Sequence, residues 1–308
     1  MIAGAFLRWQ LFLTIDEGNA MEFLTTLVNG LSLGGIYAMI ALGYTMVYGI
    51  AKMLNFAHGD IIMVGGYAIL LFLSVNPIVA IVASMIFCML LGIVVEKLAY
   101  KPLRGASPLA VLITAIGVSY LLQSIAQMIF GSAPKFIVIA DLGVLKMGGL
   151  AIGYSTIITL ACSVVVMIAL SLFVKFSKTG RAMVAVSEDK GAAQLMGINV
   201  NRIIMITFAI GSVLAALASV FFLLKAPTMS PTFGSLPGIK AFTAAVIGGI
   251  GSIPGAMIGG LLLGVIECFA QSVPAISPYT DAIEFSILII LLLVKPSGLL
   301  GKNRREKV

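Results

Sequence analysis

Four polar residues stand inside apolar stretches of this 308-residue sequence, where ionisable groups are costly and by default suggest function. Asn55, His58 and Asp60 lie at the start of one apolar run, and Glu267 lies inside another, Leu261–Ser272. The first three either cap and satisfy a helix end or line a polar path. Glu267 is either a lining residue of such a path or a structurally paired acid, and both alternatives stay open.

Signatures of enzymes are mostly missing. The chain has one histidine, so a two-histidine metal helix is impossible, and no nucleophile elbow or paired-carboxylate cleft is present. The phosphate-binding loop is also missing, because Asn303 follows Gly301-Lys302 where Ser or Thr is required. We therefore expect no catalytic residue, no metal site and no bound cofactor. If ATP drives the protein, another chain binds it.

The composition points to a membrane protein. Hydrophobic residues make up 60% of the chain and charged residues 10%, with a mean hydropathy of +1.15. So little polar surface cannot cover a water-soluble body of this size. Cys88, Cys162 and Cys268 lie in apolar runs without metal-ligand spacing, and we interpret them as small buried side chains.

Runs of roughly 20 apolar residues are long enough to cross the hydrocarbon core as helices. The fold expected is an all-α integral membrane protein, a polytopic bundle of about 8–9 transmembrane segments. The predicted spans are Phe23–Ile50, Asn55–Val75, Pro77–Tyr100, Pro108–Phe130, Ser155–Lys175, Arg202–Leu224, a broken pair over Ile239–Ser272, and Ala282–Val294.

Local punctuation supports these boundaries. Asn76 before Pro77, and Ser107 before Pro108, each offer a capping side chain followed by proline at the first helical position. Asn55 is predicted to cap the second span in the same way. After the last span, Lys295, Pro296 and Gly298 provide a stop signal.

The positive charge of +7 indicates orientation rather than nucleic-acid binding, because the basic residues gather in short connections. With these connections in the cytoplasm, the N-terminus lies outside and the C-terminus inside, which requires an odd number of crossings. Nine crossings result if the broken pair crosses twice; a re-entrant hairpin there would give eight full helices. The 14 cytoplasmic residues would be Lys52, Lys97, Lys101, Arg104, Lys175, Lys178, Arg181, Lys190, Arg202, Lys295, Lys302, Arg304, Arg305 and Lys307, leaving Arg8, Lys135, Lys146, Lys225 and Lys240 outside.

Glycines predict close helix packing and one break. Gly30 with Gly34, Gly255 with Gly259, and Gly260 with Gly264 are spaced one turn apart, which lets backbones approach in lipid. Four glycines and a proline within 248–255 cannot hold a regular helix. One interpretation is a broken helix that faces either protein or a water-filled path. The other is a plain cytoplasmic turn between two helices. The residues of the break are Gly248, Gly249, Gly251, Pro254 and Gly255.

Residues 177–201 form the one extended polar segment between spans. Ala192, Leu195 and Met196 make a small apolar stripe at helical spacing, and Gly197 with Asn199 ends it. We predict a short helix parallel to the membrane, which rests either on a partner or on lipid headgroups. The organisation is then a lead-in at 1–22, interrupted by Arg8 and without a cleavable signal, one permease-like domain at 23–296 and a basic tail at 297–308.

Several segments together resemble the branched-chain amino acid importer permeases of the ATP-binding cassette type. The similarity covers most of the chain after about Leu24, in order and with similar spacing. It is carried by residues 43–50 (GYTMVYGI), 55–60 (NFAHGD), 188–199 with Leu195-Met196-Gly197-Ile198-Asn199, and 240–256 (KAFTAAVIGGIGSIPGA).

The resemblance implies a function and a set of partners. Similar proteins sit in the bacterial inner membrane and pair with a second homologous permease. They engage two cytoplasmic ATPase subunits and receive leucine, isoleucine or valine from a periplasmic binding protein. Transport would proceed by alternating access. By this resemblance, residues 181–199 would be the coupling helix on the ATPase, with Arg181, Glu188, Ala192, Leu195, Met196 and Gly197 as its contact residues.

Two alternatives remain at this point. A related importer permease for urea, amides or other small solutes shares the same motif frame, although the Asn55-Phe56-Ala57-His58-Gly59 form resembles the amino-acid branch. A passive channel or ion-coupled carrier would need no ATPase, and the polar helix between Lys175 and Arg202 speaks against it.

Overall fold

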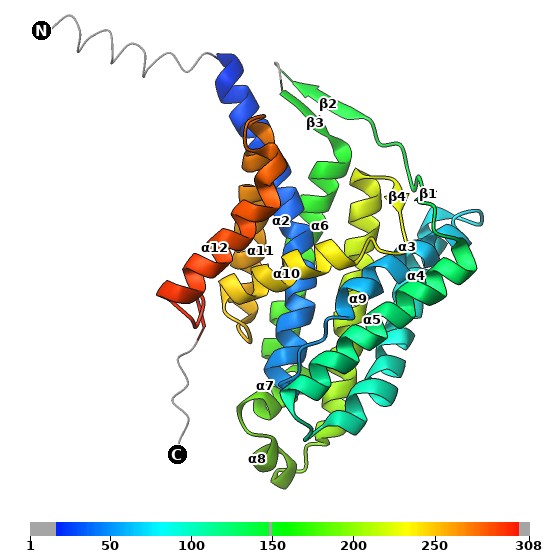
Figure 1. Cartoon of the computed structure of the whole chain (residues 1–308), viewed down its shortest axis with the longest axis vertical. Coiled ribbons are helices and arrows are strands. Elements are labelled where there is room, and N and C mark those ends of the chain that lie inside the picture. The colour runs from blue at the N-terminus through cyan, green and yellow to red at the C-terminus, as the bar shows by residue number, and fades with distance from the viewer. Residues whose placement is uncertain (1–16, 148–149, 302–308) are drawn as a thin grey trace, which may run out of the picture.

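The computed structural model describes residues 17–147 and 150–301. Within these residues the chain is an elongated bundle of helices with four very short strands (Figure 1). The predicted all-α architecture is confirmed. The first sixteen residues of the predicted lead-in, and residues 302–308 of the predicted basic tail, lie outside the described residues.

Seven helical stretches of the described chain are long and apolar enough to cross a membrane. Two shorter apolar helices, α3 (His58–Phe72) and α10 (Ser235–Gly248), complete the bundle. This agrees with the predicted set of nine apolar segments with one or two short members. The seven stretches contain α2 (Glu17–Ala51), α4 (Pro77–Val95), α5 (Pro108–Phe130), α6 (Tyr154–Phe176), α9 (Val200–Lys225), α11 (Ile253–Ser272) and α12 (Thr280–Val294), the last extended to Ser277 by a 3₁₀ turn.

The remaining elements lie towards the two ends of the bundle. Figure 1 shows the hairpin of β2 (Val144–Met147) and β3 (Leu150–Gly153) at the end where α2 begins. Helices α7 (Lys178–Glu188) and α8 (Lys190–Leu195) lie at the opposite end. A second antiparallel pair and three short turns complete the chain: β1 (Lys135–Phe136) with β4 (Thr228–Met229), the π-helical turn η1 (Glu96–Tyr100), and the 3₁₀ turns η2 (Lys101–Leu103) and η3 (Ser277–Tyr279).

Two predicted helix starts are confirmed by their capping bonds. Asn76 accepts a hydrogen bond from the backbone N–H of Ile78 at 2.8 Å, with Pro77 as the first helical residue. Ser107 accepts one from Ala110 N–H at 3.3 Å, ahead of Pro108. Both caps satisfy amide groups that have no partner inside their own helix.

The start of the second span differs from the prediction. Helix α3 begins at His58, three residues after Asn55, and its cap residue Ala57 makes no side-chain bond. The backbone of Lys52 takes a positive φ of 61°, and residues 52–57 leave α2 without regular helix before α3 begins inside the bundle. Asn55 is therefore not the predicted cap, and α3 is a 15-residue helix rather than a full span.

The start of the first span also differs. Helix α2 begins at Glu17, so the last residues of the predicted lead-in belong to this helix rather than to an irregular segment. A run from Glu17 to Ala51 is about 50 Å long at 1.5 Å per residue, which exceeds the hydrocarbon thickness of roughly 30 Å. One end of α2 therefore extends beyond the hydrocarbon layer.

The centre of the bundle is held together by backbones in direct contact. A Cβ atom on Gly34 of α2 would lie 2.7 Å from the Leu261 Cα of α11, and one on Gly264 would overlap the Gly34 backbone. On the other side of α11, a Cβ on Gly259 would overlap the Ala244 carbonyl of α10. The predicted glycine spacing thus packs α11 between α2 and α10, where dispersion contacts rather than water exclusion stabilise helix pairs.

Burial separates central from peripheral helices. Residues of α2 from Ile36 to Leu42 are almost completely buried, as is most of α9. Helices α4, α5 and α12 instead turn large apolar side chains outwards, with Met128 85% exposed and Leu293 80% exposed. An outward apolar surface of this extent fits a lipid environment and not water.

Adding one methyl group at Gly264 is predicted to destabilise the bundle. Gly264→Ala would force α2 and α11 apart, and overpacking of this kind costs about 1–3 kcal/mol. The matched control is Gly117→Ala on α5, where no atom lies within 4 Å of the added Cβ. Thermal unfolding in detergent should occur at a lower temperature for Gly264→Ala alone. Equal unfolding temperatures for both variants would contradict the close-contact assignment.

Candidate functional site

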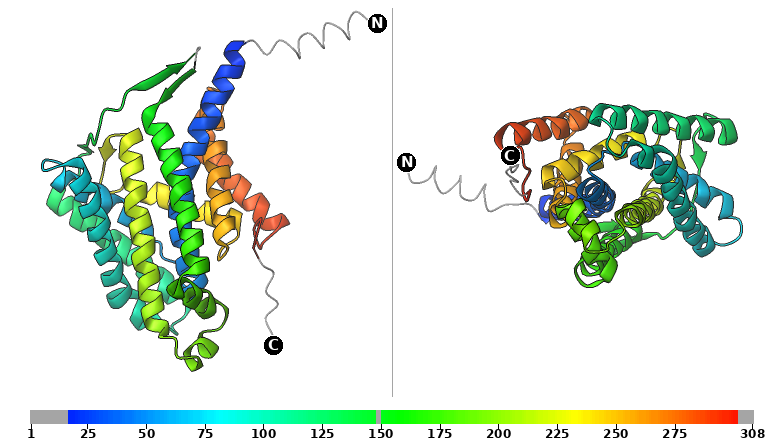
Figure 2. Two further views of the ribbon diagram at one scale, coloured as in Figure 1. Left: turned by 180° about the vertical axis from the view of Figure 1, so that it is seen from behind. Right: turned by 90° about the horizontal axis from the view of Figure 1, so that it is seen from below.

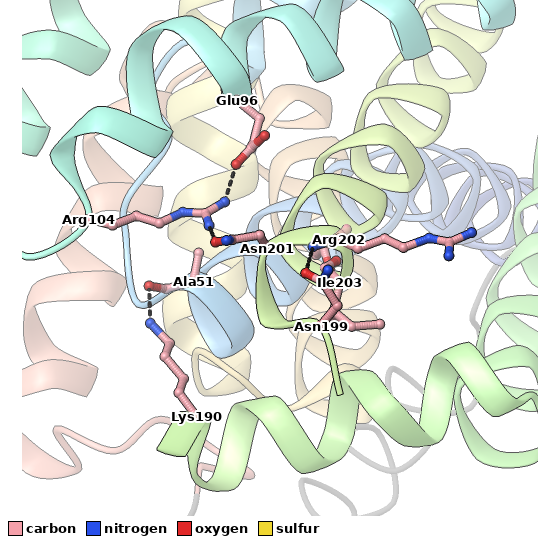
Figure 3. Close-up of polar contacts among 9 residues, drawn as sticks. Ala51, Glu96, Arg104, Lys190, Asn199, Asn201, Arg202 and Ile203 are labelled. Carbon is pink, nitrogen blue, oxygen red and sulfur yellow. Dashed lines mark hydrogen bonds and ion pairs between the residues drawn. The ribbon is translucent and has the colours of Figure 1, made fainter. Parts of the chain in front are cut away.

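The segment predicted to contact a partner folds as two helices rather than one. Ser177 caps α7 by accepting a bond from Gly180 N–H at 2.8 Å, and the extended backbone of Asp189 ends α7. Asp189 then caps α8 through Ala192 N–H at 2.9 Å. Gly197, with a φ of 81°, ends α8, and Asn199 caps α9 through Arg202 N–H at 3.0 Å (Figure 3). The chain therefore changes direction sharply at both ends of α8.

The inner face of α7 and α8 is fixed to the bundle by residues that the sequence analysis did not single out. Met183 and Val186 of α7 are each 1% exposed, and Ala193 of α8 is also buried. The Lys190 ammonium donates to the carbonyl of Ala51, the last residue of α2, at 2.9 Å (Figure 3). The three-residue spacing of Met183 and Val186 is the signal that could have identified this face.

The outer face of α8 carries the predicted contact residues. Leu195 and Met196 are 90% and 82% exposed, and Ala192 lies one turn before them on the same face. The other three predicted residues, Arg181, Glu188 and Gly197, are exposed as well. Large apolar side chains that project this far from the end of a bundle form a small apolar tip, which we call the α8 tip (Ala192, Leu195 and Met196).

A polar network lies beside this segment. The guanidinium of Arg104 donates to the Glu96 carboxylate and to the Asn201 side-chain oxygen (Figure 3). Glu96 is only 2% exposed, and the ion pair with Arg104 compensates its buried negative charge. Partial burial and the nearby Arg104 lower the pKa of Lys190 from its ordinary value. The network connects the end of α4 to the first turn of α9, close to where α8 contacts α2.

The polar residues around α3 each have a distinct surrounding. Asn55 accepts a hydrogen bond from the Tyr100 hydroxyl at 2.7 Å, which is why it does not cap α3. The His58 ring packs edge-on against Tyr44 at 4.8 Å between centroids, and its Nε2 has no hydrogen-bond partner among the described residues. All three predicted residues, Asn55, His58 and Asp60, are almost fully buried.

Asp60 belongs to a cluster that joins three helices. Its carboxylate accepts from the Gln123 side chain of α5 at 2.9 Å, and Gln123 also lies 3.0 Å from the Ser235 hydroxyl at the start of α10. The first turns of α3 and α10 meet here, because a Cβ on Gly59 would overlap the Gly234 carbonyl. The two short helices therefore begin side by side inside the bundle, with polar groups at their junction.

Glu267 is paired with a residue for which the sequence predicted no partner. Lys240, which the sequence analysis counted among the basic residues outside, lies in the middle of α10 and is 4% exposed. Its ammonium contacts Glu267 of α11 at 2.8 Å and, on α12, Asp281 at 2.8 Å and Glu284 at 3.3 Å. One buried cation thus connects three helices, and burial of Glu267 depends on it.

The glycine-rich break is a tight turn enclosed by other parts of the chain. Helix α10 ends at Gly248, Gly249 and Gly251 take positive φ values of 105° and 92°, and Ser252 caps α11. Side-chain-free residues are needed because Gly248 and Gly255 lie against each other's backbone. The amides of Leu299 and Leu300 donate to the carbonyls of Ile247 and Gly248 at 2.8 and 2.9 Å, which satisfies the free end of α10.

These features define a class of protein. Several long apolar helices, two short apolar helices, and a glycine-rich break between α10 and α11 are typical of multi-pass membrane transport proteins. No group of three or more His, Cys, Asp or Glu residues in the described chain is arranged to hold a metal ion.

Comparison with known proteins assigns the family. Residues 26–293 match the model described as branched-chain amino acid transport system / permease component, and the chain belongs to this family. It is 44% identical over 303 residues to the high-affinity branched-chain amino acid transport system permease protein BraD of Pseudomonas aeruginosa, covering 93% of this chain and 98% of the relative. It is 40% identical over 309 residues to the corresponding protein LivH of Escherichia coli, covering 94% and 98%.

Removal of the Lys240 charge is predicted to destabilise the protein strongly. Lys240→Met would leave Glu267 and Glu284 buried without their cation, and breaking a buried pair in this way costs about 3–5 kcal/mol. The unfolding temperature in detergent should fall well below that of the exposed control Lys101→Met. Adding Glu284→Gln to Lys240→Met should recover part of the loss, because one uncompensated carboxylate is removed. Absence of any recovery would contradict the assigned pairing.

Proposed function

We propose that this chain is a membrane-spanning permease subunit of an ATP-binding cassette importer and carries branched-chain amino acids. The observation that supports this most strongly is the identity of 40–44% to permeases named for that transport, over more than nine-tenths of both chains. Matches of this length leave few parts of the chain without a counterpart. The urea and amide alternative has no comparable support.

The driving ATPase is a separate pair of cytoplasmic subunits, one of which binds the α8 tip. Leu195 and Met196 are suited to this role because both are large apolar side chains that are almost fully exposed. Burial of such side chains against a partner is favourable. Recognition of an apolar helix face by a groove is a recurring way for two proteins to bind. A second homologous permease completes the path, and a periplasmic binding protein delivers the substrate at the opposite face.

Movement of α8 would reach the bundle through two connections. One is the hydrogen bond from Lys190 to the end of α2, and the other is the short link from Gly197 to the Asn199 cap of α9. Helices α2 and α9 form the buried centre of the bundle, so a displacement at α8 acts on the core directly. This supports alternating access, in which the bundle exposes its path to one face and then to the other.

The orientation follows from the same proposal. The end of the bundle with α7 and α8 faces the cytoplasm of a bacterial cell, and the β2–β3 end faces the periplasm. Lys175, Lys178, Arg181, Lys190 and Arg202 all lie in or beside α7 and α8, which agrees with the enrichment of basic residues on the cytoplasmic side of inner-membrane proteins.

Uptake of labelled leucine tests the proposed substrate. Cells or membrane vesicles with and without this chain are compared, with urea uptake measured in parallel. We expect deletion to abolish ATP-dependent entry of leucine and to leave urea entry unchanged. Loss of urea entry alone would keep the importer but replace its substrate, and no change in either would contradict the proposed function.

The coupling role is tested at the α8 tip. Leu195→Asp is expected to weaken association with the ATPase subunits at least tenfold, because a carboxylate would enter an apolar contact. Leu195→Met keeps the apolar side chain and serves as the matched control. Co-purification of the subunits and leucine uptake are measured for both. Intact association and uptake in Leu195→Asp, and also in Glu188→Lys, would rule out this coupling surface.

A further inference from the structure

An open pocket lies where α7 joins the bundle, and no residue of the α8 tip lines it. Its volume is about 570 Å³, within the range of roughly 300–1,000 Å³ that is common for ligand sites. Val174 and Lys175 of α6, Arg181 and Val184 of α7, and Ile253 and Pro254 at the start of α11 line it. Figure 2 shows these elements together at the lower part of the bundle.

The pocket has two kinds of lining at once. Lys175 and Arg181 are exposed cations, and neither forms an ion pair with a carboxylate among the described residues. The Lys175 ammonium lies 5.3 Å from the centre of the Phe176 ring, a contact that leaves it open to an anion. Ser171 of α6 adds one hydroxyl, and the remaining walls are apolar. A ligand that complements this lining carries a negative charge on an apolar body.

The surroundings of the pocket resemble the boundary of a bilayer. On one side, α6 runs upward as a membrane-length helix and exposes Leu172 and Phe176, which are 50% and 66% exposed. Ile258, one turn into α11, is also exposed. On the other side, α7 is an amphipathic surface helix with a mostly polar outer face. Acyl chains would lie along α6 and α11, with the charged group level with α7.

We propose that this pocket binds the headgroup of an anionic phospholipid, held by Lys175 of α6 and Arg181 of α7, with its acyl chains along α6 and α11. Charge complementarity selects an anionic over a zwitterionic lipid, and the apolar walls favour a lipid over a free phosphate ion. The phosphate would bridge the membrane helix and the surface helix, and so stabilise the seat of α7 against α6 and α11. The proposal concerns binding and does not depend on the substrate.

Binding is measured by native mass spectrometry of the purified full-length chain in mixed micelles. Phosphatidylglycerol is compared with phosphatidylcholine at equal concentration. Each Lys or Arg near an anionic headgroup contributes about fivefold, so the double variant Lys175→Gln/Arg181→Gln should bind phosphatidylglycerol about 25-fold more weakly. Lys178→Gln, which removes an exposed charge of α7 that does not line the pocket, should bind as the unaltered chain does.

A second variant separates this site from general surface charge and from loss of folding. Val174→Trp keeps both cations but fills the pocket, and it should also lose the preference for phosphatidylglycerol. All variants are required to elute and unfold as the unaltered chain does in phosphatidylcholine. Three outcomes would each overturn the proposal. They are equal losses of binding in Lys178→Gln and the double variant, full binding by Val174→Trp, and competition by glycerol phosphate that is as effective as that of the lipid.

Discussion

The close backbone contact of α11 with α2 on one side and α10 on the other is the constraint on which the rest of the structure depends. In a bilayer no hydrophobic drive brings helices together, so contact at van der Waals distance must supply the stabilisation. Gly34, Gly259 and Gly264 permit it, because any side chain at these positions would meet a neighbouring backbone. The ion pairs of Lys240 then connect α12 to α10 and α11. The turn at 249–252 packs against residues 297–301.

The short helices α3 and α10 gain their place from this core. A helix of 14 or 15 residues spans only about 21–23 Å at 1.5 Å per residue, which is less than the hydrocarbon thickness of roughly 30 Å. Neither helix start has a side-chain cap, but polar side chains lie at the junction, where Gln123 donates hydrogen bonds to Asp60 and Ser235. The buried polar residues, whose burial costs free energy, thus lie where the helical backbone is interrupted.

Local signals were read correctly from the sequence, and long-range pairings were not. Asn76 and Ser107 cap the helices predicted for them because a cap involves only the next three residues. Asn55 has the same local pattern, yet its side chain bonds Tyr100, 45 positions away. Lys240 was counted among the outside residues from its place in the sequence alone, and the acids that pair with it come from two other helices. The exposed face of α8 was predicted, but the division into two helices was not. Asp189 divides the segment because it ends α7 and its side chain caps α8.

The central claim is that the α8 tip is where an ATPase subunit drives this permease, and site-specific photocrosslinking tests it most directly. A photoreactive amino acid is placed at Leu195 in the assembled importer, and at Tyr120 on the outward face of α5 as a lipid-facing control. The account predicts a crosslink from position 195 to an ATPase subunit and none from position 120. A complex that hydrolyses ATP and transports leucine but gives no crosslink at position 195 would contradict it.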